Sequence, residues 1–135
     1  GKGGIGKSTV SSNVSAALVT LGEKVYQVGC DPKRDSISSL CGELKPTVLD
    51  TLRVQGMRRF TAEVLKKLVF LARGFDGRLY GTECGGPAPG KGCAGHGVDI
   101  ALNYLEKFNI INKYEFTFVL YDVLGDTVCG GFAMP

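Results

Sequence analysis

The sequence predicts an α/β fold, in which a mostly parallel sheet is flanked by helices, from three observations. A glycine-rich loop, GKGGIGKST at residues 1–9, leads directly into a stretch with apolar residues at helical spacing. A short β-rich run, VYQVG, follows at residues 25–29, and a second one, EFTFVLYDV, occupies residues 115–123. Because a loop, a helix and a strand in this order belong to a βαβ unit, the strands are expected to be parallel.

The opening loop matches the phosphate-binding pattern G-x-x-x-x-G-K-[ST]. Glycines let backbone N–H groups turn toward the phosphates, the lysine reaches the β- and γ-phosphates, and the hydroxyl ligates Mg²⁺. A glycine-rich loop without nucleotide is the alternative, but the helix that begins at once favours a P-loop NTPase-type fold. The expected nucleotide contacts in this loop are Gly1, Lys2, Gly3, Gly4, Ile5, Gly6, Lys7, Ser8 (also for Mg²⁺) and Thr9.

The elements follow from spacing and stop signals. Apolar residues from Val10 to Leu21 predict an amphipathic helix over 8–21, and Gly22 is suited to end it. Thr61 is a candidate cap for a helix that runs to Phe70. The remaining expected elements are short helices over 36–40 and 48–52, a helix over 98–108, and the strands over 25–29 and 115–123.

Bulk composition limits the class of protein. With 135 residues and 44% hydrophobic side chains, the chain corresponds to one domain that can bury a core. No apolar run reaches the roughly 20 residues of a membrane span, so no membrane association is expected. The net charge of +3 comes from dispersed basic residues, which argues against nucleic-acid binding. Five cysteines, an odd number, favour a reducing cytoplasm over a disulfide framework.

A phosphate-binding loop normally follows a buried strand, yet nothing precedes Gly1. The opposite end, at residues 129–135, stops in a glycine-rich loop soon after a strand. The expectation is therefore a single partial domain, residues 1–135, whose fold lacks its first strand and its C-terminal half and leaves a sheet edge open.

Two acidic segments follow the two strands. Asp31 and Asp35 come directly after the first, where α/β sheets place their ligands, and carboxylate oxygens suit Mg²⁺. The alternative there is an Asp-Pro turn with solvent-facing charges. Asp122 and Asp126 close the second strand, where a P-loop enzyme needs an acidic residue near its metal. Gly125 gives that segment the freedom to respond to the γ-phosphate.

Two of the cysteines lie in glycine-rich loops, where small neighbours let a bulky ligand approach. Cys93 and Cys129 cannot complete the four-thiolate set of an iron–sulfur cluster within one chain, but a symmetric dimer could supply two from each subunit. The alternative is that both are small buried hydrophobic residues. Cys30 and Cys41 adjoin apolar segments and are expected in the core. Cys84 is expected to be a spare loop thiol, and a third cluster ligand is the alternative.

With these residues assembled, the chain resembles the nitrogenase iron protein family. The resemblance runs nearly end to end, although residues 46–79 match poorly and are interpreted as a variable surface region. The motifs that carry it are GKGGIGKST, GCDPKRDS, GGPAPGKGCAGHG and YDVLGDTVCGGFAMP.

The resemblance implies a homodimer with one [4Fe-4S] cluster, held between the subunits by Cys93 and Cys129 of each. It further implies MgATP in each subunit and single electrons passed to a larger catalytic component as ATP is hydrolysed. The electron donor would be a small protein such as ferredoxin or flavodoxin.

The resemblance also assigns roles to individual residues. Lys2 corresponds to the signature lysine that approaches the phosphates across the dimer interface. Asp31, Lys33 and Asp35 correspond to the first nucleotide switch. Asp122 and Asp126 correspond to the second switch, and Asp126 or Asp31 is expected to orient the attacking water. The implied catalytic residues are thus Lys2, Asp31 and Asp126.

Some residues depart from the family pattern. His96 stands where an arginine is usual, a site of partner docking and of ADP-ribosylation in some members. SSN at residues 11–13 and VYQVGCDPK at residues 25–33 are more similar to the sister reductases that act on protochlorophyllide-like or nickel-tetrapyrrole substrates. A reductase of that type is the second hypothesis, and a non-redox deviant-P-loop ATPase switch is the third.

Overall fold

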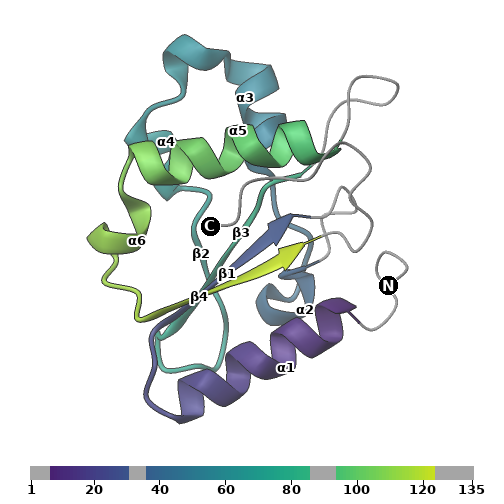
Figure 1. The fold of residues 1–135 in the computed structure, drawn as a ribbon, viewed down its shortest axis with the longest axis vertical. Coiled ribbons are helices and arrows are strands. Elements are labelled where there is room, and N and C mark those ends of the chain that lie inside the picture. The colour runs from purple at the N-terminus through teal and green to yellow at the C-terminus, as the bar shows by residue number, and fades with distance from the viewer. Residues whose placement is uncertain (1–6, 31–35, 86–93, 124–135) are drawn as a thin grey trace.

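The computed structural model describes residues 7–30, 36–85 and 94–123. Within these ranges the helices and strands alternate as expected for an α/β protein (Figure 1). In chain order they are α1 (Lys7–Thr20), β1 (Val25–Cys30), α2 (Ser38–Cys41), α3 (Val48–Gln55), the 3-10 helix η1 (Met57–Arg59), α4 (Ala62–Lys66), β2 (Phe70–Leu71), β3 (Leu79–Glu83), α5 (Ala94–Lys107), α6 (Ile110–Lys113) and β4 (Phe118–Val123).

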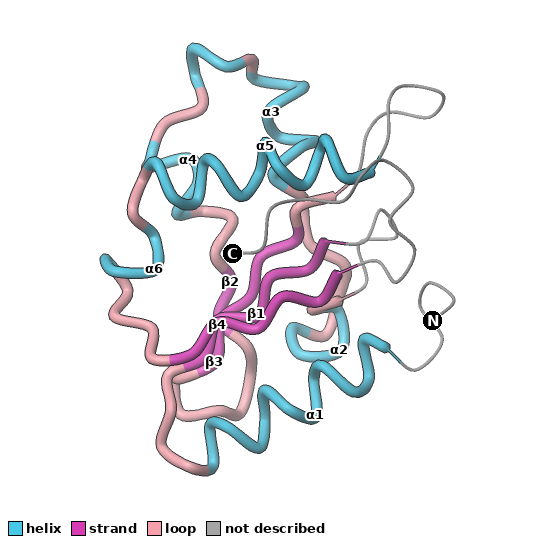
Figure 2. Tube along the Cα trace, viewed as in Figure 1, coloured by secondary structure: helices cyan, strands magenta, loops and turns pink. Residues whose placement is uncertain are grey.

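The four strands form one sheet in the order β2-β3-β1-β4. β1 pairs in parallel with both β3 and β4, and of the described strands only the two-residue β2 runs antiparallel to its neighbour. The strands, magenta in Figure 2, lie between the helices. β3 and β4 are joined through α5 and α6 and lie on opposite sides of β1, so this connection crosses over the central strand. The predicted mostly parallel sheet with flanking helices is confirmed.

β1 is buried along its whole length because helices cover both faces of the sheet. α1 and α2 lie on one side, and α3, α4 and α5 lie on the other (Figure 1). Val25 packs on the α1 side with Val19 and Leu79. Tyr26 and Val28 point to the opposite side, into the larger core. A strand covered on both faces carries apolar residues on both, which explains why the run VYQVG is apolar apart from Gln27.

α1 confirms the predicted helix but not the face that the sequence pattern suggested. Its valines Val10 and Val14 are 61% and 40% exposed, and Leu21 just beyond its end is 77% exposed. The buried side chains in the described part of α1 are Ser12, Ser15 and Val19. Small serines allow the helix to approach the sheet closely, and one of them bonds to β1, as described below. Gly22 ends the helix as predicted, with φ +93° and its N–H bonded to Val19 O at 2.9 Å.

The region between residues 46 and 79 is only in part the surface region that its sequence suggested, because residues 53–59 are exposed whereas the residues on either side of them contribute to the core. Val48, Phe60, Leu65 and Leu79 are all buried in the two cores. The helix capped by Thr61 is present, but it ends at Lys66, and β2 begins at Phe70. The cap itself is confirmed, since the Thr61 hydroxyl accepts a hydrogen bond from Val64 N.

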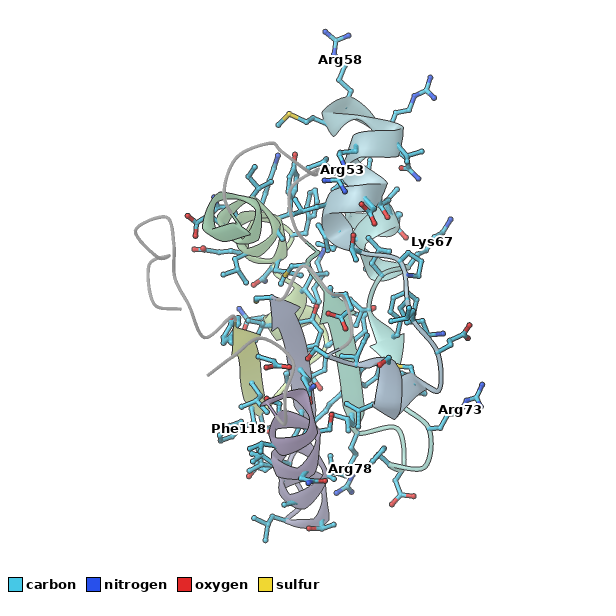
Figure 3. The ribbon with its side chains drawn as sticks, turned by 90° about the vertical axis from the view of Figure 1, so that its right-hand side faces the viewer. Arg53, Arg58, Lys67, Arg73, Arg78 and Phe118 are labelled. Atoms are coloured by element: carbon cyan, nitrogen blue, oxygen red, sulfur yellow. The ribbon has the colours of Figure 1, made fainter. Side chains whose placement is uncertain are left out.

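The prediction that Cys30 and Cys41 lie in the core is confirmed. Over the described ranges, no helix is long and apolar enough to cross a membrane. Basic side chains of separate elements, such as Arg58, Lys67 and Arg73, point outward at separate places on the surface (Figure 3).

Tyr26 gives a test of the larger core. Its ring stacks on Phe116 with centroids 4.6 Å apart, and its hydroxyl bonds to Thr82 Oγ1 at 2.5 Å. Burial raises the pKa of Tyr26 far above its ordinary value of 10.0. Above pH 10 the unfolded chain therefore releases a proton that the folded chain retains, so this group lowers stability progressively as the pH rises.

We expect Tyr26→Phe to cost about 1 kcal/mol near neutral pH through the lost hydrogen bond. The difference in unfolding free energy between wild type and variant should shrink between pH 9 and pH 11, because only the wild type carries the ionising phenol. Urea denaturation across this range checks it, and a constant difference would contradict the burial of Tyr26 in a protonated state.

Candidate functional site

The carboxyl ends of the three parallel strands lie together at one edge of the sheet. Gly29, near the end of β1, is paired with Glu83 of β3 on one side and with Asp122 of β4 on the other. The first residues of α1 and α5 lie at the same side of the molecule as these strand ends (Figure 1). In open α/β sheets, ligands bind outside the carboxyl ends of the strands, where successive connections leave in opposite directions.

Most predicted site residues lie outside the described residues, so their roles stay predictions. This holds for residues 1–6, which include Lys2, and for Asp31, Lys33, Asp35, Cys93, Asp126 and Cys129. Lys7, Ser8 and Thr9 are described by their backbone alone, as the first turn of α1. The expected helix immediately after the loop is therefore present.

Asp122 is the predicted site residue whose side chain the structure describes. It is the penultimate residue of β4 and is only 1% exposed. Its position opposite Gly29 puts a buried carboxyl group beside the central strand, at the edge where ligands bind.

Sequence analysis missed a group of buried polar side chains at the same edge. Gln27 of β1 faces α1, and its Oε1 accepts a hydrogen bond from Ser15 Oγ at 2.7 Å. The same amide donates from Nε2 to Ser36 O and to Ser36 Oγ, both at 3.0 Å. The sequence feature that could have revealed this group is Gln27 itself, the single polar residue within the otherwise apolar run VYQVG. Gln27 thus joins α1 to Ser36, which directly follows residues 31–35 in the sequence.

Glu83, the last residue of β3, contributes to the same region. Its carboxylate Oε2 accepts a hydrogen bond from Ile37 N at 2.8 Å, and the side chain is fully buried. The carboxylate lies close to Gly29. A Cβ added to Gly29 would be only 2.1 Å from Glu83 Oε1 and 2.5 Å from Ser36 Cβ. The glycine at the end of β1 is therefore required by the close approach of a buried acid.

Cys84 lies in the loop after β3, as the sequence suggested, but it is a buried core thiol rather than a spare one. It follows β3 directly, donates its N–H to Gly29 O at 2.8 Å and is fully buried. A hydrogen bond with the Cys30 thiol, together with burial, raises the pKa of Cys84 well above its ordinary value of 9.0. Cys84 is therefore held as a neutral thiol within the core.

Among the side chains that are described, no group of three or more His, Cys, Asp or Glu residues is arranged to hold a metal ion. The two cysteines predicted to ligate a cluster lie outside those ranges, so the cluster site stays a prediction.

Comparison with known families identifies the chain's relatives. A model of the 4Fe-4S iron sulfur cluster binding proteins of the NifH/frxC family matches residues 1–135, the whole chain. The chain belongs to this family. The resemblance that its four motifs indicate is thereby confirmed.

Curated members of the family match the chain over its full length. The chain is 49% identical to nitrogenase iron protein 2 of Methanothermococcus thermolithotrophicus, of which it covers 48%. It is 52% identical to the nitrogenase iron protein of Methanospirillum hungatei, of which it covers 45%. It is also 49% identical to the light-independent protochlorophyllide reductase iron-sulfur ATP-binding protein of Jannaschia sp., of which it covers 42%. The chain thus spans about half the length of these relatives.

Solved structures share the fold. The MinD cell division protein of Aquifex aeolicus matches with a TM-score of 0.55 and 25% identity, over 93% of this chain and 44% of MinD. The septum site-determining protein MinD of Pyrococcus horikoshii, solved in complex with Mg-ADP, matches with the same TM-score and 24% identity, over 94% of this chain and 47% of MinD. These matches support the P-loop NTPase-type fold of the NifH/frxC family member.

The contact between Gly29 and Glu83 gives a direct test of the site's packing. We expect Gly29→Ala to lower the free energy of unfolding by about 3 kcal/mol, because the added methyl group overlaps a buried, hydrogen-bonded carboxylate. Gly74→Ala is the control, since a Cβ there meets nothing within 4 Å and only the φ of +79° opposes it, at about 1 kcal/mol. Chemical denaturation measures both, and equal costs would refute the close approach.

Proposed function

We propose that the protein containing this chain is the ATP-dependent reductase component of a nitrogenase. It would be a cytoplasmic homodimer that takes electrons from a small donor such as ferredoxin or flavodoxin. The dimer would deliver them singly to a larger catalytic component. The observation that carries this proposal is the match to the NifH/frxC family over all 135 residues, with 49–52% identity to proteins named nitrogenase iron protein.

The nucleotide part of the proposal is supported by the arrangement at the carboxyl edge. α1 begins at Lys7, within the phosphate-binding motif, and a helix N-terminus favours phosphate. Asp122 is buried at the end of β4, at the same edge. In the proposed site, Lys7 contacts the phosphates and Ser8 contacts Mg²⁺. Lys2 of each subunit would approach the nucleotide of the other subunit. A protein of the same fold, MinD of Pyrococcus horikoshii, was solved in complex with Mg-ADP.

The redox part of the proposal concerns a [4Fe-4S] cluster between two subunits, held by Cys93 and Cys129 of each. When bound, such a cluster accepts and releases one electron at a time. Asp31, Lys33 and Asp35 would form the first nucleotide switch, and Asp122 and Asp126 the second. Because Asp126 precedes Cys129 by three residues, a γ-phosphate-dependent shift of the second switch would reach the cluster ligand.

We expect anaerobic reconstitution of the full-length protein with iron and sulfide to give a [4Fe-4S] spectrum, by absorbance and by electron paramagnetic resonance after reduction. Cys93→Ser and Cys129→Ser should each abolish it. Cys41→Ser is the matched control, because Cys41 lies at the end of α2, is buried, and is not among the proposed ligands. A wild type without the spectrum, or a Cys129→Ser variant that keeps it, would refute the cluster.

A reductase that serves a tetrapyrrole reductase is the second candidate. It is favoured by the 49% identity to the protochlorophyllide reductase component of Jannaschia sp.. The third candidate, a non-redox ATPase switch, has the fold of MinD and would carry no cluster.

The catalytic partner separates the first two candidates. The reconstituted protein, mixed with a nitrogenase catalytic component, MgATP and dithionite, should reduce acetylene to ethylene. A protein with an intact cluster that supports no acetylene reduction, but does support protochlorophyllide reduction with the matching component, would favour the second candidate.

A further inference from the structure

Hydrogen bonds connect three buried polar side chains, and a fourth bonds to the backbone of the next residue; we call these four side chains the Gln27 network. Ser15 of α1 donates to Gln27 of β1, and Gln27 donates twice to Ser36. Glu83 of β3 accepts from the neighbouring residue, Ile37 N, at 2.8 Å. Ser36 and Ile37 directly follow residues 31–35 in the sequence. The network therefore fixes the point at which the chain leaves that segment.

The network is placed where solvent does not reach. Ser15, Gln27, Ser36 and Glu83 all have 0% exposure. A buried polar group costs free energy unless its hydrogen bonds are satisfied, and an apolar side chain of similar volume often serves stability equally well. At the opposite end of the same face, α1 packs on the sheet through the apolar side chains of Val19, Val25 and Leu79. Stability therefore does not by itself require polar side chains on this face.

What the network can do follows from its geometry. The two amide hydrogen bonds of Gln27 and the carboxylate bond of Glu83 hold consecutive residues, Ser36 and Ile37. The bond from Ser15 ties the same amide to α1, the helix whose first turn belongs to the phosphate-binding motif. The Gln27 network thus links that helix to the end of the 31–35 segment through one side chain.

We propose that Gln27 and Glu83 are positioning residues for ATP hydrolysis. They fix Ser36 and Ile37 relative to α1, and thereby set the alignment between the bound phosphates and the acidic segment at residues 31–35. This inference rests on the proposed function, since it concerns the same nucleotide site. Neither side chain touches the nucleotide; each acts through the backbone that it holds.

The test is steady-state ATP hydrolysis by the full-length reconstituted protein with saturating catalytic component. Gln27→Leu keeps the volume but removes every hydrogen bond of the amide. We expect kcat to fall about 10- to 100-fold, because a misplacement of about 1 Å has this effect. The KM for MgATP should change less than threefold, since the phosphate-binding loop is intact.

Thr82→Val is the matched control. Thr82 is also fully buried, and it bonds to Tyr26 and to Leu68 O. Its loss should lower the melting temperature without a comparable fall in kcat. If Gln27→Leu lowers kcat no more than Thr82→Val does at equal loss of melting temperature, the proposal is wrong.

Glu83 offers a rescue experiment. In Glu83→Gln the side-chain carbonyl can still accept from Ile37 N, so kcat should stay within about threefold of wild type, whereas Glu83→Leu should fall as far as Gln27→Leu. An equal loss in both Glu83 variants would overturn a role through this hydrogen bond. Ser15→Ala removes a single hydroxyl, so we expect a smaller fall in kcat than in Gln27→Leu. An unchanged kcat in Ser15→Ala would contradict the link to α1.

The two proposals fail in different ways. A wild-type protein that neither binds nor hydrolyses MgATP refutes the proposed function and this inference together. A wild type that hydrolyses MgATP alongside a fully active Gln27→Leu variant refutes only the inference.

Discussion

The structure depends on the burial of β1 on both faces. α1 covers one face, α3 and α5 cover the other, and parallel neighbours close both edges. A strand in this position has no solvent-facing side on which a substitution could be accommodated, so every residue is constrained by its packing contacts. Tyr26 and Val28 fill the larger core, whereas Val25 packs against Val19 of α1. The positions of the two flanking strands, and hence of their carboxyl ends, follow from this central strand.

The α1-facing side of the sheet is divided along its length. Toward the amino ends of the strands it is apolar, with Val25 and Leu79 in contact with α1. Toward the carboxyl ends it is polar, with Gln27 and Glu83 buried and hydrogen-bonded. Gly29 makes this possible, because its missing side chain leaves the space that the carboxylate of Glu83 occupies. The apolar half supplies packing, and the polar half specifies the geometry of the proposed nucleotide edge.

The sequence predicted the fold class, α1, β1 and β4, because their signals are local: a phosphate-loop motif, a stop glycine and β-branched runs. It did not predict β3, whose Gly81 and Glu83 are poor strand formers and which depends on pairing with β1. Nor did it predict that Ser12 and Ser15 of α1 are buried while Val10 and Val14 are exposed, since helical spacing alone does not identify the covering partner. The roles of Gln27 and Glu83 arise from contacts between distant segments, which spacing along the chain cannot reveal.

The most direct measurement is hydrogen–deuterium exchange of the full-length protein with and without MgADP. If the carboxyl edge of the sheet is the nucleotide site, MgADP should slow exchange in peptides that cover residues 1–10 and 31–37. Peptides that cover α4 and α6, which lie away from this edge in Figure 1, should exchange unchanged. Unchanged exchange at residues 1–10 and 31–37, with protection elsewhere or nowhere, would contradict a nucleotide site built on the carboxyl ends of β1, β3 and β4.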